Sequence, residues 1–305
     1  MLLGPTGVGK TDLALKLATR LGVPIISADS RQLYKHLHIG TAAPSPQQLA
    51  QVRHFFVHCI EPDQRYSAAQ YEQDVLALLE QLLRTHDVAL MVGGSMLYID
   101  AVCQGLDDLP TINETLRRTL QQRLTKEGLP ALYKQLQHLD PQYAAAVDAK
   151  NPRRILHALE ICLQTGRTVS ALRGHRAERK RPFRVVKIGL TRPRDSLFQR
   201  INRRVDQMVD QGLMQEAQAL LPLRHLNALN TVGYKEMFRA LDGDWPLETA
   251  IERIKKHTRV YAKKQLTWFA HDETIHWIDL DATDEDQALT KIIDVLREEV
   301  GAAKT

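Results

Sequence analysis

The fold class of this chain is decided by one stretch near its start, Gly4-Pro5-Thr6-Gly7-Val8-Gly9-Lys10-Thr11, which fits the pattern G-x-x-x-x-G-K-[ST]. Glycines let backbone N–H groups approach phosphate oxygens closely, where a side chain would block them. Lys10 supplies a positive charge to a terminal phosphate, Thr11 can bind Mg²⁺, and the helix that follows presents its positive end. The stretch therefore predicts a phosphate-binding loop that opens a helix.

Strands and helices alternate after this loop. Apolar residues recur at helical spacing over 13–21, and 25–28 has the composition of a short buried strand that ends at Asp29. Ser67 begins a second helix with a capping-box pattern, and the apolar run 88–92 predicts a further strand. This order implies parallel strands with helical crossovers. We expect an α/β fold, with a P-loop NTPase-like core built on a parallel sheet.

The middle of the chain has a different pattern. From about residue 109 it is helical, with Thr111-Ile112-Asn113-Glu114 as a capping box, and a polar, basic segment then leads to Pro182. The run 183–190 again has the composition of a strand. We therefore predict two domains. Residues 1–108 and 183–305 form a P-loop-like core, and 109–182 form a mainly helical insertion.

Length and composition exclude several classes of protein. The 305 residues, 44% hydrophobic and 25% charged, have an ordinary globular composition. No apolar run approaches the roughly 20 residues that cross a bilayer, and no signal-peptide pattern is present, so we expect a cytoplasmic protein without membrane association. The three cysteines match no metal-binding spacing. Only three residues precede the loop, so we expect either a native start further upstream or a short first strand.

Positive charge gathers in the second half of the chain. Lys and Arg total 41 against 36 Asp and Glu, a net charge of +5 that by itself decides little. The basic residues cluster at Arg153-Arg154, 173–184, 200–204 and 255–264. Such clusters are typical of a protein that binds a polyanion. Solvated helix faces without a partner are the alternative explanation.

The loop alone does not identify a reaction. Kinases and NTPases usually carry an acidic residue at the end of a second hydrophobic strand, where it manages Mg²⁺ and water. Here the run 88–92 ends at Gly93-Gly94-Ser95, and the acidic residue, Asp29, ends the earlier strand. This arrangement favours a loop that holds a diphosphate as a leaving group over one that hydrolyses a γ-phosphate.

Further blocks follow the loop in a specific order. They are Asp29-Ser30-Arg31-Gln32-Leu33-Tyr34, Ile39-Gly40-Thr41-Ala42-Ala43-Pro44, Gly93-Gly94-Ser95-Met96-Leu97-Tyr98, Arg153-Arg154-Ile155-Leu156-His157-Ala158-Leu159-Glu160, Arg200-Ile201-Asn202-Arg203-Arg204-Val205-Asp206, Val232-Gly233-Tyr234-Lys235-Glu236 and Thr258-Arg259-Val260-Tyr261-Ala262-Lys263-Lys264-Gln265-Leu266-Thr267-Trp268-Phe269. Each block is weak alone, but the ordered set is specific. Together they resemble the tRNA dimethylallyltransferase family (tRNA isopentenyltransferases, or IPP transferases), from residue 4 to about residue 278.

The resemblance implies a reaction and its partners. Members transfer a dimethylallyl group from dimethylallyl diphosphate to N6 of adenine 37 of a tRNA, next to the anticodon, and release diphosphate with the help of Mg²⁺. A P-loop-like core holds the diphosphate in a channel, and the anticodon stem-loop inserts its flipped adenine from the other side. An anticodon loop is already single-stranded, which lowers the free energy of flipping. We expect a monomeric enzyme of this kind.

The resemblance also implies roles for individual residues. Asp29 matches the general base that accepts a proton from the exocyclic amine, and Thr11 and Arg204 match residues that hold the departing diphosphate; these three are the implied catalytic residues. Thr11 is the implied Mg²⁺ ligand. The implied diphosphate-binding residues are Gly4, Thr6, Gly7, Gly9, Lys10, Thr11 and Arg204. The implied tRNA-binding residues are Asp29, Ser30, Arg31, Gln32, Ser95, Arg117, Arg153, Arg154 and His157.

Some positions depart from the family pattern. Ser95 stands where threonine is common and keeps the hydroxyl, and Ala43 stands where many members have lysine. His157 replaces an arginine, which would weaken one RNA contact, and Lys264 replaces an arginine, which loses bidentate geometry but keeps the charge. No Cys/His metal module follows residue 280, which favours a compact enzyme of the bacterial type.

Two groups of residues have simpler explanations. Asp29 before Ser30 is also typical of a turn cap. Tyr261, Trp268 and Phe269 lie at helical spacing, and we expect them to pack in the core rather than to stack on bases.

Three other functions compete with transfer to tRNA. An adenylate isopentenyltransferase would use the same donor, but a mononucleotide needs neither the helical insertion nor the basic second half. A P-loop kinase would transfer a γ-phosphate from ATP, and the absent acidic strand end counts against it. A basic RNA-binding protein whose phosphate loop has lost its function would bind tRNA with an affinity that falls steeply with salt, and it would catalyse no reaction.

Overall fold

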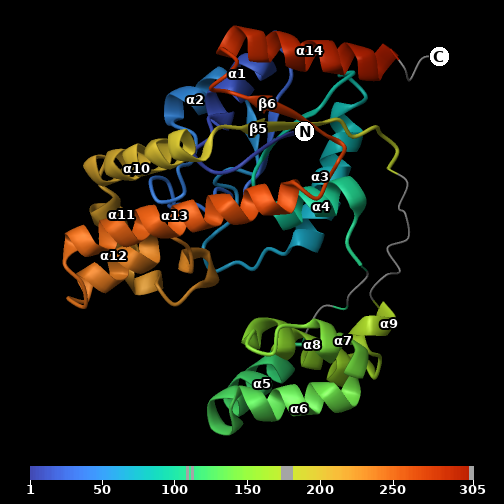
Figure 1. Ribbon diagram of the computed structural model, residues 1–305, viewed down its shortest axis with the longest axis vertical. Coiled ribbons are helices and arrows are strands. Elements are labelled where there is room, and N and C mark those ends of the chain that lie inside the picture. Colours follow the sequence, from blue (N-terminus) through green and yellow to red (C-terminus); the bar gives the residue numbers. More distant parts are fainter. Residues whose placement is uncertain (108–109, 111–112, 173–180, 302–305) are drawn as a thin grey trace. The chain divides into compact units, whose positions relative to one another are not determined.

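The computed structural model describes residues 1–107, 110, 113–172 and 181–301 (Figure 1). The chain divides into two compact units, which we call the core unit (Met1–Cys103 with Pro182–Thr305) and the helical unit (Gln104–Arg181). The predicted boundary at residues 108 and 109 lies outside the described residues. Each unit is described by itself below.

The core unit is built on one parallel sheet of six strands in the order β3-β2-β4-β1-β5-β6. The strands are β1 (Leu2–Leu3), β2 (Ile25–Ala28), β3 (His54–Phe55), β4 (Leu90–Gly93), β5 (Lys187–Thr191) and β6 (Ile275–Asp279). The predicted α/β fold with a parallel sheet is confirmed. The sequence analysis predicted neither edge strand. β3 has only two residues, and in β6 the apolar residues are interrupted by His276 and followed by Asp279.

Helices cover both sides of this sheet. The helices of the core unit are α1 (Lys10–Leu21), α2 (Pro46–Gln51), α3 (Ala68–Leu82), α4 (Met96–Gln104), α10 (Arg194–Asp210), α11 (Leu213–Leu220), α12 (Tyr234–Leu241), α13 (Leu247–Phe269) and α14 (Glu285–Gly301). Of these, α11 packs against α10, and α12 packs against α13. Figure 1 shows α1 and α14 on one side of the sheet and α13 on the other. Among the described residues, no helix is long and apolar enough to cross a bilayer.

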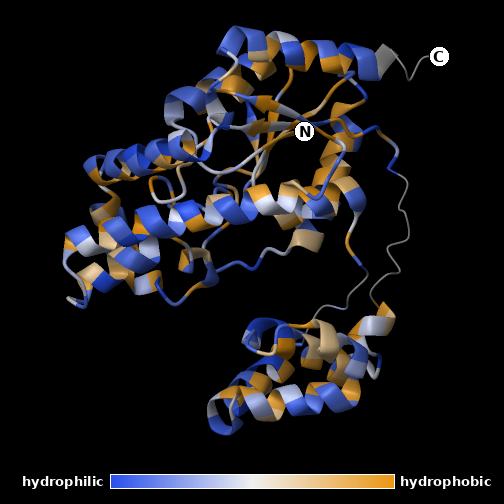
Figure 2. Cartoon of the chain, viewed as in Figure 1, coloured by the Kyte–Doolittle hydropathy of each residue, from blue (hydrophilic) through white to orange (hydrophobic). Residues whose placement is uncertain are grey.

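Amphipathic helices explain how this core closes. Leu13 and Leu17 of α1 face the sheet, and Leu197, Ile201 and Val205 recur along the buried side of α10. Figure 2 shows that the visible side of α10 is mostly hydrophilic. Burying one apolar stripe of each helix against the strands, at about 25 cal/mol per Å² of apolar area, supplies most of the driving force for this packing.

The strand order brings the predicted site residues to one edge of the sheet. β1 pairs with both β4 and β5, and β4 pairs with β2, all in parallel. Because their carboxyl ends meet at the same edge, the phosphate loop after β1 lies beside Asp29 after β2 and Ser95 after β4. Ligands of open parallel sheets bind at this edge.

The helical unit packs short helices around its own small core. They are α5 (Glu114–Glu127), α6 (Leu129–Leu139), α7 (Pro141–Ala146), α8 (Pro152–Thr165) and α9 (Val169–Leu172), and Leu120, Leu132, Leu136, Ile155 and Leu159 are buried among them. The predicted capping box at 111–114 is wrong. Asn113 caps α5 by accepting from Thr115 N (2.8 Å), since the helix begins at Glu114, and Thr111 lies outside the described residues.

Candidate active site

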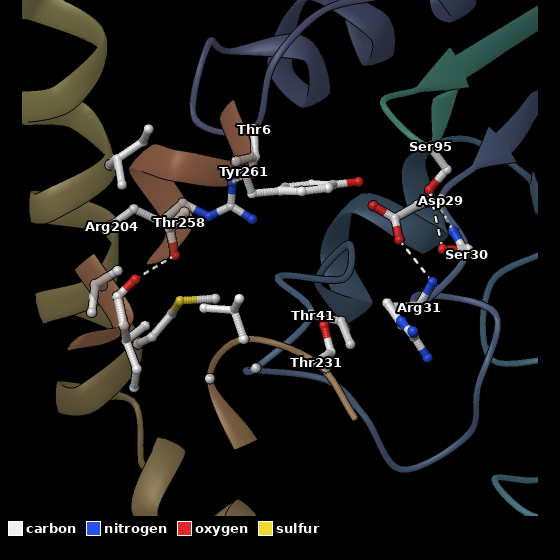
Figure 3. Close-up of a pocket in the computed structure, with 17 residues that line it drawn as sticks. Thr6, Asp29, Ser30, Arg31, Thr41, Ser95, Arg204, Thr231, Thr258 and Tyr261 are labelled. Atoms are coloured by element: carbon white, nitrogen blue, oxygen red, sulfur yellow. Dashed lines mark hydrogen bonds between the residues drawn. The ribbon is translucent and has the colours of Figure 1, made fainter. Parts of the chain in front are cut away.

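A pocket of about 300 Å³ lies at the carboxyl edge of the sheet (Figure 3). Its lining comes from the loops after β1, β2 and β4 and from α10, α13 and the segment before α12. The lining residues are Thr6, Asp29, Ser30, Arg31, Gly40, Thr41, Ser95, Ile201, Arg204, Val205, Met208, Thr231, Val232, Gly233, Ile254, Thr258 and Tyr261. Segments far apart in the sequence therefore contribute to one cavity.

The phosphate loop has the turned backbone that the glycine pattern predicted. Gly7 and Gly9 adopt positive φ angles of 82° and 113°, and a Cβ at Gly7 would lie 2.7 Å from Ile201. Lys10 Nζ donates to the carbonyls of Gly4 and Pro5, at 2.8 Å each. The glycines are therefore required both for the turn and for its close packing against α10.

Two arginines that the sequence analysis gave no role hold the same loop. Arg200 Nε donates to Gly7 O (3.1 Å), and Arg192 Nε donates to Val8 O (2.8 Å). With Lys10, three basic side chains donate to carbonyl oxygens of the loop, which fixes its backbone for anion binding through the N–H groups. Arg192 lies in none of the blocks quoted in the sequence analysis. Its position directly after β5 is the one feature of the sequence that could have indicated a role at the site.

Lys10 and Arg204 place two basic side chains beside the loop. Arg204 Nη1 donates to Thr6 Oγ1 at 3.2 Å. Burial and, as a smaller cause, the charge of Arg204 lower the pKa of Lys10, the charge of Asp29 acts in the opposite direction, and the resulting pKa is about 7. Two cations held together away from water repel each other, and a bound diphosphate would relieve this repulsion.

We expect diphosphate binding to take up a proton at about pH 8. Lys10, with a pKa of about 7, is then mostly neutral in the free protein, and an anion beside it favours the protonated form. Affinity for diphosphate should therefore fall as pH rises above about 7. Calorimetric titrations in buffers of different ionisation enthalpy measure the uptake. Lys10→Met should abolish it, and Lys16→Met, an exposed lysine on the same helix, should keep it. Equal uptake in Lys10→Met would contradict this assignment.

Asp29 lies at the end of the pocket formed by the β2 and β4 loops. Its Oδ1 accepts from the backbone N–H groups of Arg31 (2.8 Å) and Gln32 (3.3 Å). Asp29 therefore caps a turn, as its position before Ser30 also suggested, and it lines the pocket at the same time. One carboxylate oxygen is held by backbone amides, and the carboxylate is oriented by them.

Ser95 and Tyr261 surround this carboxylate. Ser95 Oγ accepts from Ser30 N at 2.9 Å, which joins the β4 loop to the β2 loop. The Tyr261 ring directs its hydroxyl toward Asp29 in Figure 3. Burial raises the pKa of Tyr261 to about 12, the negative charge of Asp29 adds to the rise, and Ser95 acts against it. Tyr261 therefore keeps its proton near neutral pH and presents an O–H donor.

The expectation that the α13 aromatics all pack in the core is wrong for two of them. Phe269 is buried, whereas Tyr261 is 37% exposed and lines the pocket and Trp268 is 45% exposed. The helical spacing was read correctly. The prediction of which helix face is buried was wrong, because Gln265 rather than an aromatic residue fills the buried position beside the loops after β1 and β4.

Gln265 joins the two halves of the pocket. Its Oε1 accepts from Thr6 N and its Nε2 donates to Gly94 O, both at 2.8 Å, and its side chain is buried. A Cβ at Gly94 would lie 2.4 Å from Nε2, so a side chain there would displace the Gln265 amide from this position. The sequence analysis quoted Gln265 within a block but gave it no role, since no local pattern reveals a contact 171 residues away.

Glu216 anchors the loop that carries Gly40 and Thr41. Its carboxylate accepts from the backbone N–H groups of His38 (3.1 Å), Ile39 (2.9 Å) and Gly40 (2.9 Å), and from the Tyr234 hydroxyl (2.6 Å). The sequence analysis also missed this residue. Tyr234 belongs to the block 232–236 of the sequence analysis, and its hydrogen bond to Glu216 connects that block to the loop of Gly40 and Thr41.

We expect Glu216→Gln to loosen this loop. Glutamine keeps one acceptor oxygen, so some of these N–H groups lose a charged partner, and the free energy of unfolding should fall by about 1–3 kcal/mol. Because the loop lines the pocket, KM for the acceptor should rise more than KM for the donor. Denaturant unfolding and steady-state kinetics measure both effects, with Gln215→Ala as an exposed neighbouring control. Unchanged KM values in Glu216→Gln would contradict the positioning role.

The side of the pocket away from Asp29 is apolar. Ile201, Val205 and Met208 of α10, Val232 and Ile254 form this part of the lining. An apolar surface beside two cations suits a short hydrocarbon chain attached to a diphosphate, because the chain leaves water while the phosphates keep charged partners. The sequence analysis did not single out these residues, because apolar residues on amphipathic helices look like ordinary core.

The other predicted tRNA contacts in the core unit are partly engaged within the protein. Arg31 lines the pocket, and its Nη1 donates to Asn227 O at 2.8 Å. Gln32 does not line the pocket, and its Nε2 donates to Ala42 O (3.0 Å) and Thr41 O (3.3 Å). Gln32 thus supports the loop of Gly40 and Thr41.

The remaining predicted contacts lie in the helical unit. Arg117 Nε and Nη2 donate to Glu160 at 2.9 and 3.2 Å, and His157 Nδ1 lies 3.2 Å from Glu160 Oε2. Glu160 is buried, so this cluster holds α5 against α8. Arg153 and Arg154, in the first turn of α8, are exposed.

Thr11, the predicted metal ligand, is the exposed second residue of α1 and does not line the pocket. Among the described residues, no group of three or more His, Cys, Asp or Glu side chains is arranged to hold a metal ion. A Mg²⁺ that accompanies a diphosphate keeps waters and phosphate oxygens as most of its ligands. One hydroxyl beside the phosphate loop fits such a metal.

Comparisons with known proteins agree with this geometry. A model of the IPP transferase family matches residues 32–272. The tRNA dimethylallyltransferase 1 of Phocaeicola vulgatus is 54% identical over 285 residues, which cover 93% of this chain and 95% of that protein. The tRNA dimethylallyltransferase 2 of Porphyromonas gingivalis (strain ATCC 33277) is 53% identical over 292 residues, which cover 96% and 97%.

Solved structures give the same result. The tRNA isopentenylpyrophosphate transferase of Bacillus halodurans superposes with a TM-score of 0.73 at 35% identity, covering 99% of this chain and 96% of that one. A eukaryotic dimethylallyltransferase studied while acting on tRNA has a TM-score of 0.79 at 25% identity, covering 99% of this chain and 79% of that one.

Proposed function

Because this chain belongs to the IPP transferase family, we propose that it transfers a dimethylallyl group from dimethylallyl diphosphate to N6 of adenine 37 in tRNA, next to the anticodon. The chain is a prenyltransferase enzyme that acts on tRNA. The observation that carries the finer proposal is the pocket itself. It places Asp29 at one end, Arg204 with Thr6 beside the phosphate loop, and an apolar lining between α10 and α13.

The donor would lie along the cationic and apolar parts of this pocket. Gly4, Gly7 and Gly9 turn the loop so that its N–H groups can face the diphosphate, with Lys10 and Arg204 beside it. The dimethylallyl group would contact Val205 and Met208. As the carbon–oxygen bond of the donor breaks, negative charge grows on the diphosphate, and these cations stabilise it.

The acceptor amine would lie at the Asp29 end. An exocyclic amine is a poor nucleophile whose proton becomes acidic as the new carbon–nitrogen bond forms, so a carboxylate within hydrogen-bond reach accelerates the step. The turn amides that bind Oδ1 orient Asp29 for this role. The apolar lining keeps water from the allylic centre, which would otherwise hydrolyse.

Mg²⁺ is the metal that we propose for this reaction. The Thr11 hydroxyl is the side chain that would hold it, with diphosphate oxygens as further ligands. When bound, Mg²⁺ neutralises charge on the leaving diphosphate.

We propose that the helical unit contributes to tRNA binding. Arg153 and Arg154 are exposed at the start of α8, where they can contact phosphates without losing another partner among the described residues. Arg117 and His157 would act mainly by orienting this surface, because both bind Glu160. We further propose a monomer, in the cytoplasm where tRNA is modified.

A reaction with purified protein tests the proposed function. The protein is incubated with Mg²⁺, dimethylallyl diphosphate and unmodified tRNA, and the digested nucleosides are weighed by mass spectrometry. We expect a prenylated adenosine from position 37. Prenylation of AMP without tRNA would instead indicate an adenylate isopentenyltransferase, and consumption of ATP would indicate a kinase.

A further inference from the structure

One buried side chain, Gln265 of α13, connects the loop that would hold the donor to a loop at the acceptor end of the pocket. Its Oε1 accepts from Thr6 N in the phosphate loop, and its Nε2 donates to Gly94 O in the loop after β4, at 2.8 Å each. The residue is 2% exposed. Because a backbone N–H can only donate and a carbonyl can only accept, the amide has one possible orientation. Neither a carboxylate nor an apolar side chain could form both bonds.

On the donor side this connection reaches Arg204. Thr6 uses its backbone N–H for Gln265 and its hydroxyl for Arg204, whose Nη1 donates to Thr6 Oγ1 at 3.2 Å. A diphosphate is a stronger acceptor for a guanidinium than a neutral hydroxyl is. A bound diphosphate therefore competes with Thr6 for Arg204, and Thr6 is the residue through which the loop responds to the donor.

On the acceptor side the connection reaches Asp29. The residue after Gly94 is Ser95, and its N–H donates to Ala28 O at 3.1 Å. Its Oγ accepts from Ser30 N at 2.9 Å. These two partners are the chain neighbours of Asp29, so the backbone is held on both sides of the proposed base. A continuous series of hydrogen bonds and peptide bonds thus runs from the phosphate loop to the general base.

The two loops lie too close together to shift independently. A Cβ at Gly94 would lie 3.0 Å from Gly4 O and 2.4 Å from Gln265 Nε2. If one loop shifted alone, a bond of the buried amide would break, and a buried polar group without a partner is unfavourable. The favourable response to a ligand is therefore a joint movement of both loops.

We propose that Gln265 is a positioning residue that couples the binding of the two substrates. Donor binding at the phosphate loop fixes, through Gln265, the loop that holds the backbone around Asp29, and so raises the affinity for the RNA. Coupling between two sites is reciprocal, so the RNA raises the affinity for the donor by the same factor. This inference rests on the proposed function, because it requires the adenine beside Asp29 and the diphosphate beside Arg204.

The test measures this factor in the whole chain. Calorimetry with Mg²⁺ gives the Kd of a thiolodiphosphate analogue of the donor, which binds without reacting, in the absence of RNA and with a saturating anticodon stem-loop. We expect the RNA to lower this Kd by about 10-fold in the wild-type protein. Gln265→Met has a side chain of similar length that forms neither hydrogen bond, so the ratio of the two Kd values should fall to about 1-fold.

Gln265→Glu provides a second variant in case Gln265→Met does not fold. Its carboxyl group can form both bonds when it is protonated, but only the bond to Thr6 N when it is ionised. The Kd ratio of this variant should therefore fall as the pH rises, and by more than the wild-type ratio does. Lys10 titrates in both proteins, so the two are compared at each pH.

Phe269→Leu is the matched control. Phe269 is buried one turn further along α13, and its side chain has no polar atom. Its replacement should lower the free energy of unfolding and keep the Kd ratio of the wild type.

Failure of this proposal can be distinguished from failure of the proposed function. If the wild-type protein forms no prenylated RNA, the proposed function fails and the coupling fails with it. If the wild type transfers the prenyl group, an unchanged Kd on addition of RNA, or a wild-type ratio in Gln265→Met, would overturn the coupling alone. Equal losses of coupling in Gln265→Met and Phe269→Leu would also overturn it, because the effect would then belong to the stability of α13.

Discussion

Asp29→Asn should lower kcat for prenyl transfer by about 10²–10⁴-fold while leaving the fold of the β2 loop intact. Asparagine keeps a side-chain oxygen that can accept from Arg31 N, as Asp29 Oδ1 does at 2.8 Å. It cannot accept the proton of the amine. The substitution therefore separates the two roles of this residue, the turn cap and the general base. Single-turnover rates at saturating tRNA and donor measure the effect.

Asp29→Ala provides the comparison. It removes the cap as well as the base, so it should lose the same activity and in addition about 1 kcal/mol of unfolding free energy. Affinity for dimethylallyl diphosphate should not weaken in Asp29→Asn, because the lost charge has the same sign as the ligand. An Asp29→Asn enzyme with nearly wild-type kcat would mean that Asp29 only caps the turn.

Arg204→Met should lower kcat by about 10²–10³-fold and weaken donor binding. The variant removes a half-buried charge beside Thr6 and replaces it with a side chain that suits the apolar lining next to it. Because Arg204 also lowers the pKa of Lys10, that pKa should rise, and proton uptake on diphosphate binding at about pH 8 should become smaller. Rapid-quench kinetics and calorimetry measure the two effects.

Arg203→Met is the matched control, because Arg203 is the exposed neighbour on α10 and does not line the pocket. It should leave kcat and donor affinity close to those of the wild type. Equal losses in Arg203→Met and Arg204→Met would show that the overall positive charge of α10, and not the position of Arg204, is responsible.

Local patterns in the sequence were sufficient for the elements around the phosphate loop. The strand 25–28 was predicted with the bounds of β2, because four apolar or small residues lie between a glycine-proline stop and an acidic end. The run 88–92 overlaps β4, which extends to Gly93. The carboxyl ends of these strands place Asp29 and Ser95 together, as the parallel topology requires.

Contacts between segments far apart in the sequence could not be predicted from these local patterns. Gln265 bridges Thr6 and Gly94, and Glu216 binds backbone N–H groups 176 to 178 residues away, but neither lies in a local motif that signals such a bond. The exposure of Trp268 could not be predicted either, because it depends on which face of α13 packs against the loops after β1 and β4. Periodicity gives the spacing of a helical stripe, and only packing decides which stripe is covered.

The central claim is that one pocket holds the diphosphate beside Arg204 and the adenine beside Asp29. The most direct test is calorimetric titration of dimethylallyl diphosphate and, separately, of the anticodon stem-loop into Asp29→Asn and Arg204→Met. We expect Arg204→Met to bind the diphosphate at least about 10-fold more weakly and the RNA normally, whereas Asp29→Asn keeps full affinity for the diphosphate. Loss of diphosphate affinity in Asp29→Asn, or its retention in Arg204→Met, would contradict the account.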